Sequence, residues 1–108
     1  MKLTIDYEKI MKDINLLDVV GCCERLTDLG NGEHINRHLF ILEEIEEEPF
    51  IKVNSNTNTA WINGEKITFH KLISLIKQYN NCDTLQAKQK IKEITGVDPD
   101  DPKYRIYS

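Results

Sequence analysis

Long apolar runs, a secretory leader and a disulfide framework are all missing from this sequence of 108 residues. No apolar run approaches the roughly 20 residues that cross a bilayer as a helix. The opening stretch MKLTIDYEKIMKD mixes acidic, basic and apolar side chains, unlike a secretory signal. The three cysteines, Cys22, Cys23 and Cys82, include an adjacent pair and make a poor disulfide set. We therefore expect a cytoplasmic protein that does not insert into a membrane.

Internal repeats and low-complexity linkers are absent too, and glycine and proline number only five and three. The apolar share of 40% and the charged share of 30% are ordinary for a soluble globular protein. A chain of this length can bury a modest core of its own. We expect one domain over residues 1–108, with a core in residues 7–95 and an irregular tail over residues 97–108, where two prolines fall.

Motifs for catalysis are also missing. The sequence contains neither the G-x-S-x-G turn of a serine hydrolase nor a phosphate-binding P-loop. The carboxylates of EEIEEE, residues 43–48, form a continuous run, which is typical of a solvated surface. A cysteine and a histidine brought together by folding are the remaining route to a nucleophile. We expect a protein that is not an enzyme and that carries no cofactor.

One sign of charge dominates each part of the chain, although the net charge is only -4. Residues 1–49 carry five basic and twelve acidic side chains, a balance of -7. Residues 50–92 carry seven lysines and two acidic side chains, a balance of +5, and residues 93–108 return to -2. The overall excess of acid argues against strong general binding to nucleic acid. The basic segment indicates either an anionic partner or an ordinary solvated surface.

Apolar residues at helical spacing predict a helical region near the N-terminus. Residues 7–26 have one apolar stripe, formed by Ile10, Ile14, Leu17 and Val20. Asp13 is suited to cap a second helical segment, so we expect a kink or break near it. The glycines of LGNGEH, residues 29–34, end this helical region.

Two more helices are predicted near the C-terminus. Thr68 is placed to cap a helix over residues 69–79, whose inner face carries Leu72, Ile73 and Ile76. Thr84 is placed to cap a helix over residues 85–95, and Gly96 to end it.

The middle of the chain predicts strands. RHLFILEE, residues 37–44, has a continuous apolar centre, and residues 47–54 and 58–63 predict two further strands around a polar loop. The Asn-Gly pair at residues 63–64 predicts a tight turn. A helix, three strands and two helices in this order predict an α+β fold with a small antiparallel sheet of about three strands.

Several segments of the chain are informative through their order and spacing. They are INLLDVV at residues 14–20, Leu26 with Gly30, PFIKV at residues 49–53, Trp61, KLISLI at residues 71–76 and TLQAKQKI at residues 84–91. Over residues 7–95 this order resembles the N-terminal zinc-binding domain of bacterial DNA primases and of primase-like proteins of phages, plasmids and conjugative elements. The resemblance implies a zinc-ribbon-like fold, a link to DNA replication or mobilisation, and a surface that faces single-stranded DNA. The resemblance does not extend to nucleotide polymerisation, because the family's polymerising domain is separate and needs a much longer chain.

The zinc ligands of that family have no match here. Counting along the family's pattern puts its two ligand pairs at Phe40 and Glu43 and at Asn63 and Lys66. Phenylalanine and a lysine ammonium offer zinc no lone pair. We therefore expect a zinc-ribbon-like domain without metal, in which the apolar residues around Phe40 fill the place of the ion.

A different metal site is an alternative. His34 and His38 are four residues apart, but their neighbours are typical of a loop entering a strand, where this spacing does not converge. The adjacent side chains of Cys22 and Cys23 diverge on a helix, and His70 lies in a third place. The prediction is buried structural cysteines and surface histidines, with no metal.

The resemblance also suggests which residues contact single-stranded DNA. They are Lys52, Trp61, Lys66, His70 and Lys71. An aromatic ring among lysines fits base stacking combined with attraction to the phosphate backbone. Alternatively, Trp61 is simply the largest core residue of a small domain.

Protein interaction is the second class of function. The acidic EEIEEE segment suits a basic partner from replication or a mobile element, or keeps an edge strand from pairing. An exposed face shared by Trp61 and the lysines favours DNA binding, whereas a buried Trp61 favours protein interaction.

Overall fold

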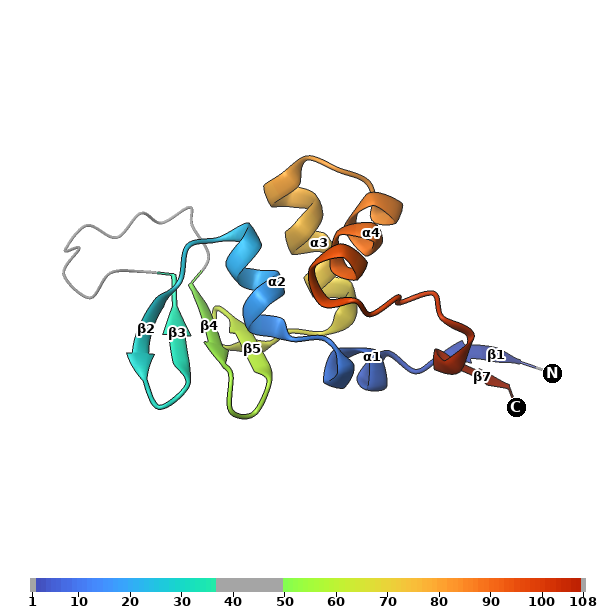
Figure 1. The fold of residues 1–108 in the computed structure, drawn as a ribbon, viewed down its shortest axis with the longest axis horizontal. Helices are drawn as coiled ribbons and strands as arrows, with labels where there is room; N and C mark the ends of the chain where they lie inside the picture. Colours follow the sequence, from blue (N-terminus) through green and yellow to red (C-terminus); the bar gives the residue numbers. More distant parts are fainter. Residues whose placement is uncertain (1, 37–49, 108) are drawn as a thin grey trace.

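The computed structural model describes residues 2–36 and 50–107, and these form an α+β fold as the sequence predicts (Figure 1). None of the described helices is both long and apolar enough to span a membrane. The elements in chain order are β1 (Leu3–Ile5), α1 (Tyr7–Asp13), α2 (Leu16–Cys23), β2 (Thr27–Gly30), β3 (Glu33–Ile35), β4 (Ile51–Asn54), β5 (Thr59–Ile62), β6 (Glu65–Lys66), α3 (Phe69–Asn80), α4 (Thr84–Thr95), a 3-10 helix (Pro102–Tyr104) and β7 (Arg105–Tyr107).

The larger sheet has five described strands instead of the three expected. Their order is β2-β3-β4-β5-β6, and each strand pairs antiparallel with the next. The prediction that the glycines of LGNGEH end the helical region is wrong, because α2 already ends at Cys23. The stretch forms most of the β2–β3 hairpin instead. Its turn residues Gly30, Asn31 and Gly32 have φ of 88°, 54° and 80°, which glycine and asparagine tolerate best. The strand predicted over residues 37–44 lies outside the described residues.

The Asn-Gly turn forms where the sequence predicts it. Asn63 and Gly64 have φ of 51° and 84°, as a two-residue hairpin turn requires. Asn63 also bonds to Phe50, the residue before β4, because its backbone N–H donates to the Phe50 carbonyl and its Oδ1 accepts from the Phe50 N–H, both at 2.8 Å. The turn leads into β6 before α3 begins, so it sets the register of a second hairpin.

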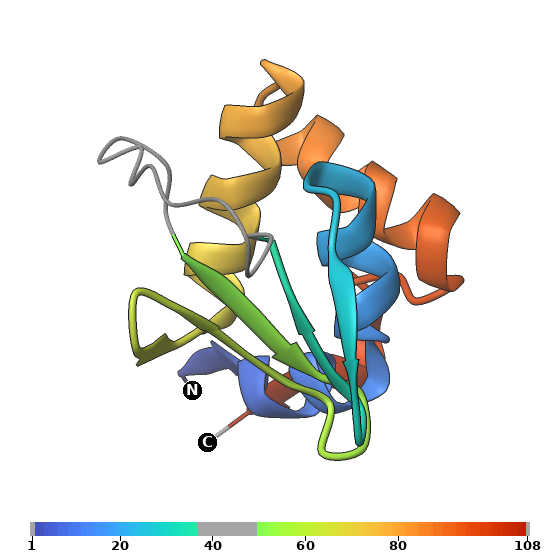
Figure 2. The ribbon, with the colours of Figure 1, turned by 90° about the vertical axis from the view of Figure 1, so that its left-hand side faces the viewer.

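Helices cover one face of the five-stranded sheet (Figure 2). α2 packs against β4 and beside α3, and α4 packs on both of these helices. β1 and β7 form a separate two-stranded ribbon, which joins the two ends of the chain away from the larger sheet (Figure 1).

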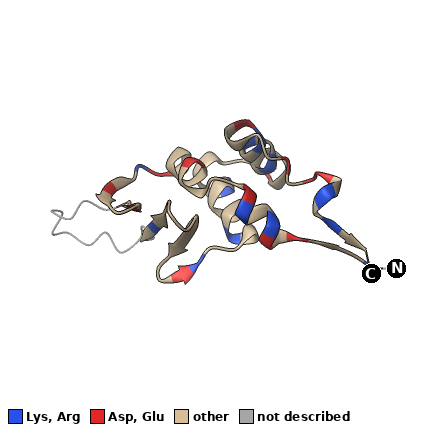
Figure 3. Ribbon diagram, turned by 60° about the horizontal axis from the view of Figure 1, so that its bottom comes forward, with Lys and Arg blue, Asp and Glu red and all other residues tan. Residues whose placement is uncertain are grey.

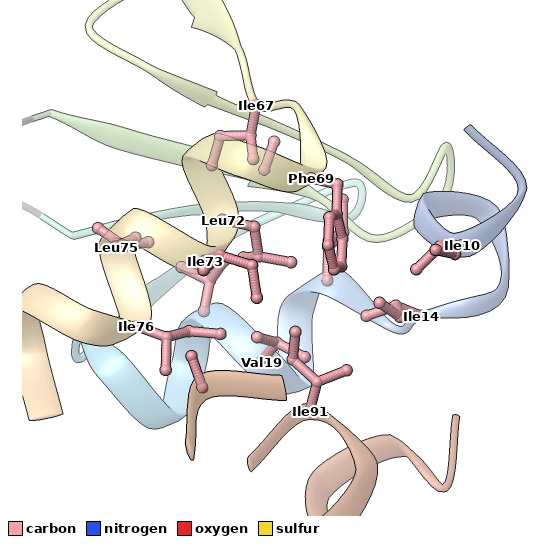
Figure 4. Close-up of a cluster of buried hydrophobic side chains, with 14 of the residues drawn as sticks. Ile10, Ile14, Val19, Ile67, Phe69, Leu72, Ile73, Leu75, Ile76 and Ile91 are labelled. Carbon is pink, nitrogen blue, oxygen red and sulfur yellow. The ribbon is translucent and has the colours of Figure 1, made fainter. Parts of the chain in front are cut away.

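The hydrophobic core lies between these helices and the sheet (Figure 4). The three inner residues predicted for α3, Leu72, Ile73 and Ile76, are all buried, which confirms that prediction. In the apolar stripe predicted for residues 7–26, Leu17 is the one member that is not buried, since its side chain is half-buried. The other members of that stripe are buried, namely Ile10, Ile14 and Val20.

The helical break near Asp13 is confirmed, but Asp13 is not the cap. Asn15 caps α2, since its side-chain oxygen accepts from the Asp18 N–H at 3.3 Å. Asp13 ends α1, and its Oδ2 accepts a hydrogen bond from the Tyr104 hydroxyl at 2.7 Å. Ile14 is extended between the two helices, so Asn15 is the residue that precedes the new helix.

Asn58 connects this break to the β4–β5 turn. Its Nδ2 donates to the carbonyls of Ile14 at 2.8 Å, Met11 at 3.2 Å and Lys12 at 3.3 Å. Its Oδ1 accepts from the Leu16 N–H at 3.0 Å. One side chain therefore bonds to the end of α1 and to the start of α2.

The helix caps of the C-terminal half follow the sequence with one shift. Thr68 caps α3 as predicted, because its hydroxyl accepts from the Lys71 N–H. Asp83, and not Thr84, caps α4. The Gln86 N–H donates to the Asp83 side chain, and the Asp83 N–H donates to Oε1 of Gln86, so these two residues form a capping box that Thr84 cannot form. Gly96 ends α4 in the left-handed conformation, as predicted.

The tail over residues 97–108 is not irregular throughout. Asp101 caps the 3-10 helix, and Pro102 begins it at a position where no N–H is needed. Tyr104 is fully buried, and its carbonyl accepts from the Asp6 N–H at 2.7 Å. Docking of this tyrosine brings the following residues alongside β1, where they form β7.

Candidate nucleic-acid interface

Three of the five candidate DNA contacts lie in one row across the sheet. Lys52 on β4 is directly opposite Trp61 on β5, and Trp61 is directly opposite Lys66 on β6. Opposite residues in an antiparallel pair point to the same face, with Cβ atoms about 4.5–5.5 Å apart. Val53 follows Lys52 and Ala60 precedes Trp61, so both point to the opposite face, and both are buried in the core. The row therefore lies on the face away from the core, and we call Lys52, Trp61 and Lys66 the outer row.

Trp61 is half-buried and lies outside the hydrophobic core cluster. The largest fully buried side chain among the described residues is Tyr104. The Lys52 ammonium is 5.9 Å from the centroid of the Trp61 ring, within the range of a cation–π contact. Trp61 is thus not the core residue of the alternative interpretation, and its ring lies beside the Lys52 ammonium, with Lys66 opposite it on β6.

The two lysines of the outer row differ in their pairing. The Nζ of Lys52 is 3.2 Å from Oε1 of Glu33 on β3, and these side chains are 40% and 41% exposed. An exposed ion pair contributes about 0–1 kcal/mol, so a phosphate can compete for this lysine. Lys66 is exposed and forms no ion pair with any residue that the structure describes. Lys66 is therefore the more available cation.

The other two candidates lie in the first turn of α3, apart from the outer row. Lys71 forms an ion pair with Glu65, and its hydrogen bond lowers the pKa of the Glu65 carboxyl. His70 is exposed, and its ring makes an edge contact with Tyr7 with the centroids 4.6 Å apart. The structure thus puts three of the predicted contacts in one row of the sheet and the other two on a helix.

His70 belongs to a groove of about 690 Å³ between α1, the β4–β5 turn and the start of α3. On its wall the Tyr7 ring stacks on Phe69, with centroids 5.3 Å apart and planes 19° apart. Tyr7 is 37% exposed, whereas Phe69 is only 5% exposed. Lys66 also lines this space, which we call the Tyr7 groove. The groove therefore adjoins the outer row at Lys66.

Tyr7 and Glu33 are not among the candidate residues from the sequence. Tyr7 meets His70 only because α1 packs against α3. Glu33 meets Lys52 only because β3 pairs with β4. No local pattern in the sequence signals either contact, since the partners are far apart along the chain.

The described positions that the primase resemblance aligns with zinc ligands do not fit a metal. Asn63 uses its side-chain oxygen on the Phe50 backbone, and Lys66 is a cation in the outer row. Phe40 and Glu43 lie outside the described residues. Within residues 2–36 and 50–107, no group of three or more His, Cys, Asp or Glu side chains could hold a metal ion.

The cysteines are only partly buried, contrary to the sequence prediction. Cys22 is exposed, because it lies on the open side of the last turn of α2. Cys23 and Cys82 are half-buried and pack against the core. Burial raises the pKa of the Cys23 thiol, and the neighbouring Cys22 adds to the rise. His34 lies on β3 and His70 on α3, while His38 is outside the described residues.

Many lysines of the basic segment have an acidic neighbour in the fold. On α4, Lys88 lies 3.0 Å from Asp100 and Lys92 lies 3.6 Å from Asp98. Figure 3 shows basic and acidic segments side by side along the helices. The charge balance of residues 50–92 therefore does not form one basic patch, and the outer row is distinguished by geometry more than by charge.

No family model matches the chain, and no curated protein or solved structure matches it. The functional conclusion therefore depends on the geometry of the outer row and the Tyr7 groove.

Proposed function

We propose that this domain is a non-catalytic, primase zinc-ribbon-like module that binds single-stranded DNA weakly through the outer row. The observation that carries the proposal is the strand register, which puts Trp61 between Lys52 and Lys66 on the face away from the core. A base stacks on the indole while the two ammonium groups attract the neighbouring phosphates. Such binding fits a role in DNA replication or mobilisation, as the family resemblance implies.

The expected affinity is low, for three reasons. The outer row has only one aromatic ring and two cations. One of the cations, Lys52, already pairs with Glu33. The chain as a whole carries a charge of -4, which repels DNA. We expect a dissociation constant near 10⁻⁴ M or weaker at physiological salt, in the range of non-specific binding. Sequence preference is small, because every base has a face that can stack.

Fluorescence of Trp61 tests the proposal directly, because it is the only tryptophan in the chain. We expect saturable quenching when an oligothymidylate of about eight nucleotides is added. The titration is done at about 20 mM salt, where screening is weakest. Absence of quenching under these conditions would overturn DNA binding by the outer row.

A matched pair of variants sharpens this test. Glu33→Gln frees Lys52 from its ion pair and should tighten binding about two- to fivefold, the equivalent of a surface ion pair. Asp100→Asn changes the net charge equally but frees Lys88 on α4, which is not among the candidate contacts. Equal tightening by both variants would indicate a general charge effect and not a contact at Lys52.

The alternative proposal is a metal-free module that binds a basic replication or mobile-element protein through residues 43–48. That acidic segment lies outside the described residues, so the alternative rests on the sequence. The half-buried Trp61 beside two lysines favours the DNA proposal over this one.

A further inference from the structure

We infer that the Tyr7 groove holds the nucleotide next to the one stacked on Trp61, with its base against Tyr7 and its phosphate near Lys66. This inference rests on the proposed function, since it extends the same bound strand. It assigns a role to Tyr7, Lys12 and His70, which line a part of the surface that the outer row does not use.

The aromatic wall of the groove is held in place before any ligand arrives. Phe69 supports the Tyr7 ring from the core side, and the edge contact with His70 limits its rotation. Tyr7 nevertheless stays 37% exposed. A ring that is fixed and accessible is suited to base stacking, because little side-chain freedom is lost on binding.

The charged groups of the groove favour an anion. Its lining includes Lys12 and Lys66 against one carboxylate, that of Glu8, with His70 as a further donor. Both lysines are exposed, and neither forms an ion pair with a described residue. A base with its phosphate matches this pairing of an aromatic wall with cations better than an apolar ligand does.

The size and position of the groove fit a neighbouring nucleotide. Its volume of about 690 Å³ lies within the usual range for small-ligand sites, about 300–1,000 Å³. Lys66 belongs to the groove and is also directly opposite Trp61. β6 is the edge strand of the sheet, so DNA stacked on Trp61 reaches the groove by passing around this one edge, at Lys66.

One titration by nuclear magnetic resonance reads the two places separately. The isotope-labelled chain is titrated with an oligothymidylate of about eight nucleotides at about 20 mM salt. The single indole N–H signal reports the outer row, and the ring signals of Tyr7 and His70 report the groove. We expect all three to shift along one binding curve.

Variants of the aromatic wall test the stacking contact. Tyr7→Leu should weaken binding about 5- to 150-fold, the effect of removing one stacked base, while Tyr7→Phe keeps the ring and the affinity. His70→Ala is a second variant, because this exposed side chain can be removed without opening the core. It should weaken binding at least twofold while the folded spectrum is retained.

A charge-matched pair tests the cation. Lys12→Gln should weaken binding about two- to fivefold, whereas Lys77→Gln, the same change in the last turn of α3, should not. A shift of the Trp61 signal without any shift at Tyr7 and His70, and with full affinity in Tyr7→Leu, would overturn the groove site and leave the outer row standing. No shift of the Trp61 signal would overturn the proposed function itself.

Discussion

A single asparagine, Asn58, bonds to both helices at the junction of α1 and α2, although the sequence predicts it only as the first residue of a strand. Asn58→Asp keeps the size and the acceptor of the side chain but turns an oxygen toward three carbonyls. We expect a loss of about 1–3 kcal/mol in the free energy of unfolding, because several hydrogen bonds are lost and two partly buried carbonyls lose their donor. Urea denaturation measures this loss.

Asn31 supplies the control for Asn58. It also has a positive φ in a hairpin turn, but its side chain is exposed. Asn31→Asp should change stability by no more than about 0.5 kcal/mol. Similar losses in the two variants would mean that the bonds of Asn58 contribute little.

Tyr104 should make the stability depend on alkaline pH. Burial, followed by the hydrogen bond to Asp13, raises the pKa of Tyr104 from 10.0 to about 12. Between these values the unfolded state releases a proton that the folded state keeps, so the contribution is complete below pH 10 and is lost as the pH rises toward 12. The expected slope is about 1.4 kcal/mol per pH unit.

Tyr104→Phe removes this proton and the bond to Asp13. At neutral pH it should cost about 1.5–3 kcal/mol, as for hydrogen bonds to charged groups. The difference between the two proteins should shrink above pH 10, as measured by urea denaturation at several pH values. A difference that stays constant up to pH 12 would contradict the raised pKa.

Among the secondary-structure elements, α4 offers the clearest test, because two adjacent residues compete to cap it. Asp83→Ala should lower the free energy of unfolding by about 0.5–2 kcal/mol, since the capping box is lost. Thr84→Ala places a good helix former inside the first turn and should change stability by less than about 0.5 kcal/mol. Thermal denaturation of the two variants compares them, and a larger loss for Thr84→Ala would assign the cap to Thr84.

Prediction of the elements succeeded where neighbouring residues decide the structure. The N-terminal cap of α3 at Thr68 and the turn at Asn63 depend on residues one to three positions apart, and they form as predicted. The β2–β3 hairpin and the β1–β7 ribbon were not predicted. Their strands are short and mostly exposed, so no alternation of apolar residues marks them, and pairing partners in the fold stabilise them instead.

For the whole molecule, the position of each lysine should matter more than the total charge. Replacing Lys52 and Lys66 together by Gln should reduce the slope of log K against log salt by about 1.4, because each phosphate contact to a single strand contributes about 0.7. Replacing Lys88 and Lys92 by Gln changes the net charge equally but affects lysines that pair with Asp100 and Asp98. The second change should leave the slope unaltered, and equal changes of slope would indicate that binding is not confined to the outer row.

Neighbours along the chain were enough to establish the α+β class, the broken N-terminal helix, the inner face of α3 and the Asn-Gly turn. Each of these depends on backbone preferences, caps or apolar spacing within one or two helical turns. Only the tertiary structure decided that Trp61 stands between Lys52 and Lys66, that Lys71 is paired, and that Tyr7 meets His70. Strand register and helix packing bring these groups together, and both are set by burial of the shared core and not by the residues that end up on the surface.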